Sequence, residues 1–113
     1  MPKRLVLFDI DGTLISTQGR SVRAMHESYE AVWGKPTAHL DYSMDGKTEL
    51  GITYDLLKLA DIPRDQVSAK LEKFWPFYVD TMRRLLQPEH VVLHPGVRQL
   101  VAAVDEHSDT VLG

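Results

Sequence analysis

The chain has 113 residues, no cysteine and a formal net charge of −3. This length fits one domain or parts of two, and the lack of cysteine excludes a disulfide scaffold, a thiol nucleophile and a thiolate zinc site. Because the charge is slightly acidic and no apolar run is long enough for a membrane span or a signal peptide, we expect a cytoplasmic protein that binds neither nucleic acid nor a membrane.

The first predicted element is a short strand near the start of the chain. Residues 5–8 form an uninterrupted apolar run, which is followed by Asp9, Asp11 and Gly12. Such a run, ended by aspartate and glycine, is typical of a strand buried on both faces of a parallel sheet.

Two amphipathic helices are predicted next. The first begins near Thr17 and ends at Gly34, and the second is capped by Thr48 and ends before Pro63. Apolar side chains recur on one face of each helix at helical spacing. These positions are Val22, Met25, Tyr29 and Val32 in the first helix and Ile52, Leu56, Leu59 and Ala60 in the second.

A third helix is predicted to be capped by Asp65 and to end before Pro88. Pro76 lies inside it, so we expect a kink or a break near Trp75. Its apolar stripe consists of Leu71, Phe74, Trp75, Tyr78, Met82 and Leu85.

The last part of the chain predicts an extended link, a helix and the beginning of another strand. The link spans residues 91–93, Pro95 fits the first position of the fourth helix, and residues 109–113 resemble the start of a strand. The inward positions of this helix are Val97, Leu100, Val101 and Val104. The pattern of strand, helices and strand predicts an α/β fold.

The residues that carry chemistry follow the first strand. Asp9 and Asp11 are two residues apart, so an extended backbone places them on the same side, and Gly12 allows a sharp turn after them. Two neighbouring carboxylates suit one nucleophile or metal ligand and one acid or base. The alternative is a structural turn capped by two aspartates. An EF-hand loop is excluded because Thr13 and Leu14 stand where it needs Asp or Asn and then Gly.

The segment 5–14 resembles the first motif of the haloacid dehalogenase (HAD) superfamily. The helical insertion after it is similar to the cap of the phosphoglycolate phosphatase-like and β-phosphoglucomutase-like members. Residues 46–48 resemble the substrate-facing loop of that cap, and residues 93–97 resemble the return to the core. The resemblance implies a Rossmann-like core, of which the first strand, one helix and the start of the second strand are present, and an inserted helical cap.

The resemblance implies three segments, which are core strand and catalytic loop at 1–16, cap at 17–90, and return to the core at 91–113. Because a later Ser or Thr, a Lys and further acidic residues of the family cannot be assigned, we expect a truncated chain. A C-terminal part of the same protein, or another chain, would then complete the core, and these 113 residues alone would be inactive.

The resemblance also implies a mechanism and a site. Asp9 attacks a phosphoryl group and becomes an aspartyl phosphate, and Asp11 protonates the leaving oxygen. Mg²⁺ is held by the Asp9 carboxylate and the Asp11 carbonyl, and backbone N–H groups near Ile10 to Thr13, those of Gly12 and Thr13 among them, face the phosphate. Lys47 is the candidate contact in the cap to a small phosphorylated metabolite, or else a solvated loop lysine.

Three functions remain open from the sequence. A Mg²⁺-dependent phosphohydrolase is favoured, because Glu49 stands where the mutase-like members place an arginine for a second phosphate. A phosphosugar mutase is the second possibility. The third is a non-catalytic binding or regulatory module that retains the first motif.

Overall fold

The computed structural model describes residues 3–113, and the chain divides into two compact units. One unit is Arg20–Leu85, and the other joins Met1–Gly19 to Leu86–Gly113. The first unit contains three helices and the second contains the strands.

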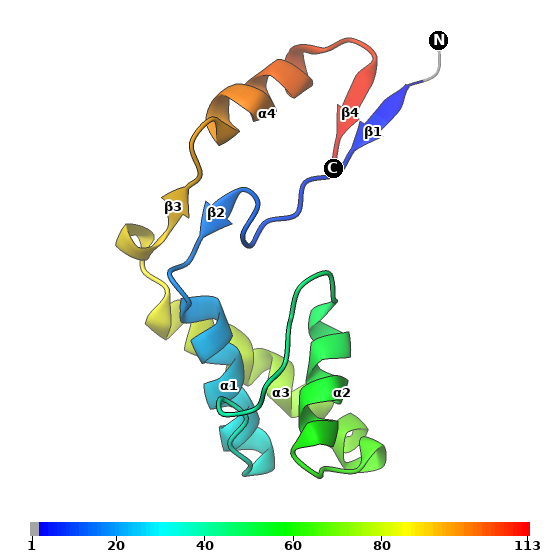
Figure 1. Ribbon diagram of the computed structural model, residues 1–113, viewed down its shortest axis with the longest axis vertical. Coiled ribbons are helices and arrows are strands. Elements are labelled where there is room, and N and C mark those ends of the chain that lie inside the picture. The colour runs from blue at the N-terminus through cyan, green and yellow to red at the C-terminus, as the bar shows by residue number, and fades with distance from the viewer. Residues whose placement is uncertain (1–2) are drawn as a thin grey trace. The chain divides into compact units, whose positions relative to one another are not determined.

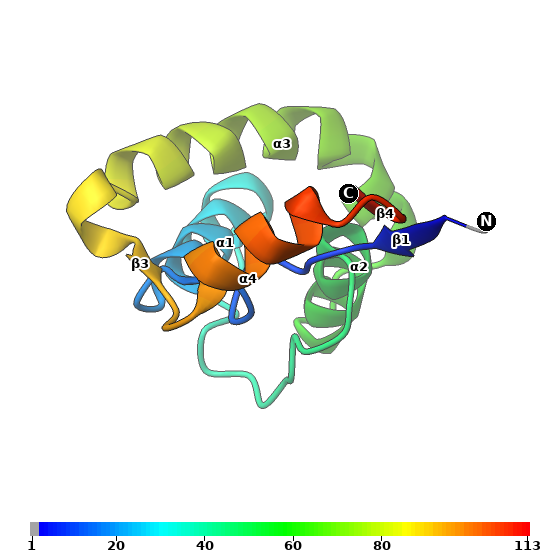
Figure 2. The ribbon, with the colours of Figure 1, turned by 90° about the horizontal axis from the view of Figure 1, so that it is seen from above.

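The helical unit is built from α1 (Arg20–Trp33), α2 (Glu49–Leu59) and α3 (Arg64–Leu85). The helix α1 ends as predicted at Gly34, whose N–H donates to the carbonyl of Glu30 at 2.8 Å and whose left-handed φ of 74° turns the chain away from the helix. Figures 1 and 2 show α1 lying beside the longer α3, which is its main packing partner.

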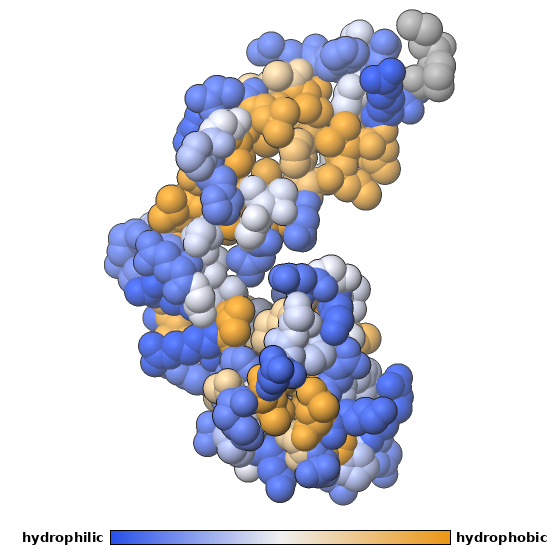
Figure 3. All heavy atoms as spheres, in the orientation of Figure 1, coloured by the Kyte–Doolittle hydropathy of each residue, from blue (hydrophilic) through white to orange (hydrophobic). Residues whose placement is uncertain are grey.

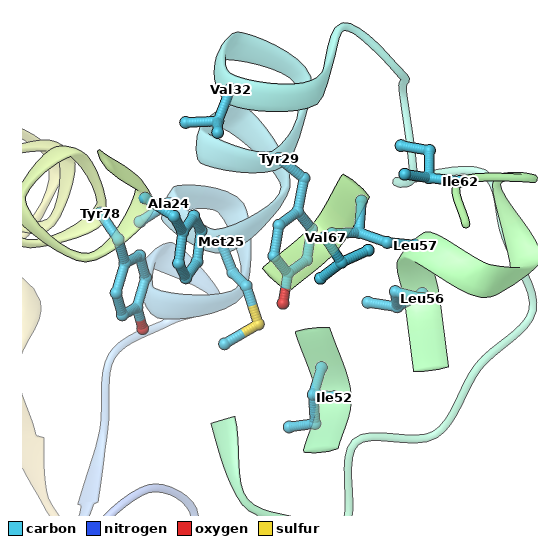
Figure 4. Packing of buried hydrophobic residues seen from close by; sticks show 11 residues of the cluster. Ala24, Met25, Tyr29, Val32, Ile52, Leu56, Leu57, Ile62, Val67 and Tyr78 are labelled. Atoms are coloured by element: carbon cyan, nitrogen blue, oxygen red, sulfur yellow. The ribbon is translucent and has the colours of Figure 1, made fainter. Parts of the chain in front are cut away.

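The core of this unit is an aromatic stack between α1 and α3. The Phe74 ring is fully buried and lies 5.3 Å from the Tyr29 ring and 5.6 Å from the Tyr78 ring, nearly parallel to both. Offset stacking of this kind adds to the stabilisation from apolar burial. Figure 4 shows how aliphatic side chains from α1, α2 and α3 close around the stack. The other buried apolar residues are Ala24, Met25, Val32, Ile52, Leu56, Leu57, Ile62 and Val67.

Several predicted features of the helices differ from the structure. The helix α3 begins at Arg64, so Asp65 lies in its first turn and does not cap it, and α3 continues through Pro76 without a break. Val22 and Leu59 are exposed, although the helical spacing predicts them on the same face as the buried residues of their helices. Both lie in a terminal turn of their helix, where spacing sets the direction of a side chain but does not ensure that a neighbouring element covers it.

Thr48 caps α2 as predicted, and its replacement should weaken this helix. Its side-chain oxygen accepts a hydrogen bond from the Gly51 N–H at 3.1 Å. We expect Thr48→Ala to lower the free energy of unfolding by about 1 kcal/mol, because the N–H loses its partner. Thr48→Ser keeps the hydroxyl and is the matched control in urea unfolding. Equal losses for the two variants would contradict the capping role.

His26 makes the stability of the helical unit depend on pH. Its Nδ1 lies 2.6 Å from the Oγ1 of buried Thr37, and burial lowers the pKa of His26 from 6.5. The unfolded chain therefore binds this proton more readily than the folded chain does. The stability is complete above the unfolded pKa and is lost as the pH falls from there through the lower pKa of the folded state.

We expect the free energy of unfolding to decrease from about pH 7.5 to about pH 5, and His26→Gln to flatten this dependence. Urea unfolding at several pH values measures the slope. His39→Gln, at an exposed position, is the control and should leave the slope unchanged. A wild-type slope in His26→Gln would show that another group is responsible.

The second unit contains a parallel pair of short strands, β1 (Arg4–Val6) and β4 (Thr110–Leu112), in which Arg4 is opposite Thr110. The strand expected at 109–113 is therefore confirmed. The expectation that residues 5–8 are buried on both faces is wrong, since Leu5 is 64% and Leu7 is 71% exposed. Among the described residues the sheet has two strands, and so small a sheet offers little surface against which other elements could pack on both faces.

The rest of this unit consists of a second pair of strands, a short 3₁₀ turn and a helix. An antiparallel pair joins β2 (Ile15–Ser16) to β3 (Val92–Leu93), a pairing that the sequence pattern did not predict. A short 3₁₀ turn, Pro88–His90, precedes β3, and α4 (Val97–Glu106) follows it.

The helix α4 differs from its prediction at its start and on its apolar side. Gly96, with a φ of 82°, precedes the helix, so Pro95 lies outside it. Leu100 is 53% exposed and no residue of α4 is buried, because the helix lies beside a sheet of only two strands among the described residues. In the described part of the chain, no helix combines the length and apolar character needed to cross a membrane.

Candidate functional site

The two candidate carboxylates lie on the loop that follows β1. The chain leaves the strand after Val6, and Asp9 and Asp11 are both exposed. This loop leaves the carboxyl end of a strand in a parallel pair, which is the edge where open α/β sheets bind ligands. Asp9 and Asp11 thus lie at the edge of the sheet where a ligand could bind.

A tight turn closes the loop directly after Asp11. Gly12 has a φ of 77°, a conformation that glycine adopts without the steric cost of a Cβ. The Ile10 carbonyl accepts hydrogen bonds from Leu14 at 2.9 Å and from Thr13 at 3.2 Å, and the Gly12 N–H donates to the Ile15 carbonyl at 2.9 Å. These contacts fix the path of the backbone on which the carboxylates sit.

The same hydrogen bonds bear on the expected phosphate contacts. The N–H groups of Gly12 and Thr13 donate inside the turn, and their contact with a phosphate stays a prediction. The Ile10 N–H makes no backbone hydrogen bond within residues 3–113. Of the amides at the start of this loop, that of Ile10 is therefore the better candidate donor to an anion.

The donor set at the loop suits a hard cation. Carboxylate oxygens such as those of Asp9 and Asp11, and a backbone carbonyl such as that of Asp11, are the ligands that Mg²⁺ prefers. Among the described residues, however, no group of three or more His, Asp or Glu side chains could hold a metal ion. Asp9 and Asp11 therefore fit one side of a magnesium site, and further ligands would have to be water, substrate or other residues.

The return segment is held against this loop by a contact that the sequence did not indicate. The His94 N–H donates to the Leu14 carbonyl at 3.0 Å, next to the β2–β3 pair, where Ile15 is opposite Leu93. The His94 Nε2 is buried and has no hydrogen-bond partner. The sequence analysis identified residues 93–97 as a return to the core, but nothing in these residues indicated that His94 would contact Leu14.

An apolar hollow of about 510 Å³ lies beside the loop within the same unit. Its lining is apolar except for Arg98 and Asp105, and neither Asp9 nor Asp11 contributes to it. Such a surface does not suit a phosphate, so the hollow is not the site of the chemistry. The apolar lining residues are Ile10, Leu14, Ile15, Leu93, Val97, Val101 and Ala102.

Lys47 lies in the helical unit, where it is held by two neighbours. Its ammonium is 4.1 Å from the centre of the Tyr42 ring and 3.8 Å from an Asp55 oxygen. The Tyr42 hydroxyl donates to the same Asp55 oxygen at 2.6 Å. The pKa of Tyr42 is raised, mainly by partial burial and to a smaller extent by this hydrogen bond. Lys47 thus contacts Tyr42 and Asp55, and its contact with a substrate stays a prediction.

Comparisons with known proteins point to a fold. No protein-family model matches the chain, and no curated protein is similar to it in sequence. The structure resembles that of a predicted phosphoglycolate phosphatase from Haemophilus somnus 129pt, with a TM-score of 0.61 and 16% identity over 98% of this chain. It also resembles a protein described as a β-phosphoglucomutase from Thermotoga maritima, with a TM-score of 0.44 and 24% identity over 96% of this chain.

The first of these proteins is described as a phosphatase and the second as a mutase. At 16% identity the first similarity shows a shared fold and nothing further, and the second is too low to support a fold assignment. The chain spans about half of each matched structure, 49% of the first and 48% of the second. The mixed helix and strand structure agrees with an α/β fold of this type.

Proposed function

We propose that this chain supplies the nucleophile loop of a Mg²⁺-dependent phosphohydrolase that acts on a small phosphomonoester. The observation that carries the proposal is the placement of Asp9 and Asp11, two exposed carboxylates on a loop that leaves the carboxyl end of β1 and is closed by the Gly12 turn. The fold shared with the Haemophilus somnus structure supports the same assignment.

In the proposed reaction the two carboxylates have different tasks. A carboxylate oxygen of Asp9 attacks phosphorus, and the bond from phosphorus to the leaving oxygen breaks. Protonated Asp11 gives its proton to that oxygen, so the product leaves as an alcohol. Asp11 then removes a proton from a water molecule, whose oxygen attacks the aspartyl phosphate, releases phosphate and restores Asp9.

The Asp9 carboxylate and the backbone carbonyl of Asp11 would hold Mg²⁺. When bound, the ion would offset the repulsion between the carboxylate and the phosphate. Because Mg²⁺ is smaller than Ca²⁺ and prefers a near-octahedral set of oxygen ligands at short distances, Ca²⁺ should replace it poorly.

We expect chelation by EDTA to remove the activity of the full product of the gene, added Mg²⁺ to restore it, and added Ca²⁺ to restore much less. Phosphate release from a panel of small phosphomonoesters is the measurement. The helical signal in circular dichroism should not change on chelation, which controls for unfolding. Full activity in EDTA would contradict the metal requirement.

The proposed roles of the segments follow the sequence analysis. Residues 1–16 and 91–113 would belong to the core, and residues 17–90 would form the cap that selects the substrate. Lys47 is the proposed contact, and binding a substrate anion would require it to exchange its pairing with Asp55. Cytoplasmic location remains a prediction.

The 113-residue chain alone should turn over little substrate. Among residues 3–113 no third acidic group accompanies Asp9 and Asp11, and phosphoryl transfer depends on several positioned charges. We propose that a C-terminal continuation, or another chain, supplies them. Conversion of a sugar 1-phosphate to the 6-phosphate without phosphate release would instead identify a mutase.

A further inference from the structure

A second hollow lies in the helical unit, where α1 ends and the chain passes from α2 to α3. Its volume is about 320 Å³, near the lower limit for small-molecule sites. Figure 1 shows the end of α1 and the connection between α2 and α3 at the same end of this unit. The residues that line the hollow all lie between positions 33 and 70, so they belong to the helical unit alone.

One wall of the hollow is an aromatic ring that is fixed in place. The Trp33 indole N–H donates to the Gln66 carbonyl at 3.1 Å, and its ring lies 5.3 Å from the Phe74 ring in the core. Ile62, which is 7% exposed, and Ala69 add apolar surface. A ring whose position is already fixed loses little conformational entropy when a planar ligand packs against it.

Three charged side chains line the same hollow and do not neutralise one another. The Lys70 ammonium donates to the Val32 carbonyl at 3.3 Å, which uses one of its three N–H groups. Within residues 3–113, Lys35, Lys70 and Asp61 form no ion pair. Figure 3 shows hydrophilic side chains over much of the visible face of this unit, so charge alone does not distinguish the hollow. Two ammonium groups without a counter-ion beside a fixed ring do distinguish it, because both attract an anion.

Asp61 is held in position by the end of α2. Its N–H donates to the Lys58 carbonyl at 3.0 Å, and the Ile62 N–H donates to the Leu57 carbonyl at 2.9 Å. The Asp61 φ of 62° lies in the left-handed region, which favours glycine and then asparagine and aspartate. Together with the two lysines, its carboxylate leaves the hollow with one net positive charge, which suits a ligand with one negative charge.

We propose that this hollow binds a small aromatic carboxylate. The ring of the ligand would pack against the Trp33 indole, and its carboxylate would pair with the ammonium groups of Lys35 and Lys70. Asp61 would repel the ligand carboxylate and so limit the affinity. None of the lining residues is Asp9, Asp11 or Lys47, so binding here is tested separately from the proposed turnover.

The test adds benzoate to the ¹⁵N-labelled full product of the gene and follows the backbone amide signals by NMR. We expect shifts at Lys35, Ile62 and Lys70 that saturate as the benzoate concentration rises. Acetate has the carboxylate without the ring, and benzamide has the ring without the charge. Each should therefore bind at least about threefold more weakly than benzoate.

Variants separate the contributions of the charges. Lys35→Gln and Lys70→Gln should each raise the dissociation constant for benzoate at least about threefold. Asp61→Asn should lower it by a similar factor, because the change removes the negative charge and asparagine tolerates the left-handed backbone. A gain in affinity cannot result from loss of folding. Lys73→Gln, at an exposed position of α3 outside the hollow, is the matched control and should bind like the wild type.

Several results would overturn the proposal. These are the absence of saturable shifts at the residues of the hollow, equal affinities for benzoate, acetate and benzamide, and unchanged affinity in both lysine variants. An unchanged or weaker affinity in Asp61→Asn would also overturn it. Circular dichroism should show the same helix content in all variants, so that a change in binding can be assigned to the substituted side chain.

Discussion

Replacing Asp9 with asparagine is expected to reduce phosphate release by the full product of the gene at least about 10⁴-fold. Asparagine keeps the size of the side chain but removes the anionic oxygen that attacks phosphorus. Asp9 is exposed on its loop, so the substitution should leave the unfolding transition in place. Steady-state assays with a phosphomonoester, together with urea unfolding, separate loss of chemistry from loss of structure.

Two further variants sharpen this test. Asp105→Asn makes the same charge change at an exposed position of α4 and should retain activity. Asp11→Asn should lose more activity with an alkyl phosphate than with a nitrophenyl phosphate, because a nitrophenolate leaves without needing a proton. Near-normal activity of Asp9→Asn would remove Asp9 as the nucleophile, and equal losses of Asp11→Asn on both substrates would remove Asp11 as the acid.

Phe74→Ala should destabilise the helical unit by about 3–5 kcal/mol. The Phe74 side chain is fully buried and its ring lies between those of Tyr29 and Tyr78, at 5.3 Å and 5.6 Å. Truncation removes both stacking contacts and leaves a cavity that the rigid neighbouring rings cannot fill. Because native proteins have a total stability of only about 5–15 kcal/mol, this change should remove a large share of it.

Phe77→Ala is the matched control for this change. Phe77 lies on the same helix and is 41% exposed, so the substitution should cost about 1 kcal/mol or less. Thermal unfolding followed by circular dichroism, with amide exchange in α1, measures both variants. Similar losses for the two would contradict the assignment of Phe74 to the centre of the core.

Local rules predicted the helix ends at Thr48 and Gly34 correctly and those at Asp65 and Pro95 wrongly. Thr48 and Gly34 act at the ends of their own helices through hydrogen bonds to residues of the same helix, so neighbouring residues suffice to predict them. Leu59 and Leu100 are exposed despite their helical spacing. Whether a neighbouring element covers such positions depends on tertiary packing, which spacing alone does not contain.

Pro76 illustrates the same distinction. A proline removes one helical hydrogen bond and disfavours the helix before it, which led to the expectation of a kink or break. The helix α3 nevertheless continues, and buried Phe74 and Tyr78 lie on either side of Pro76. Burial of both side chains in one core holds the two halves of the helix together.

The candidate site was predictable where it is local. Asp9, Asp11 and Gly12 are close in sequence, and their order alone indicated an acidic loop with a sharp turn. The internal hydrogen bonds of Gly12 and Thr13, and the pairing of Lys47 with Tyr42 and Asp55, required the folded backbone. A single sequence does not show which residues far apart along the chain will come into contact.

The most direct measurement of the central proposal is the detection of a phosphoryl group on Asp9 itself. The full product of the gene would be mixed with a phosphomonoester and Mg²⁺, quenched in acid, reduced with borohydride to convert an aspartyl phosphate into homoserine, and mapped by peptide mass spectrometry. The proposal predicts homoserine at position 9, dependent on Mg²⁺ and absent in Asp9→Asn. Phosphate release at a normal rate with no modification of Asp9 under any quench time would contradict it.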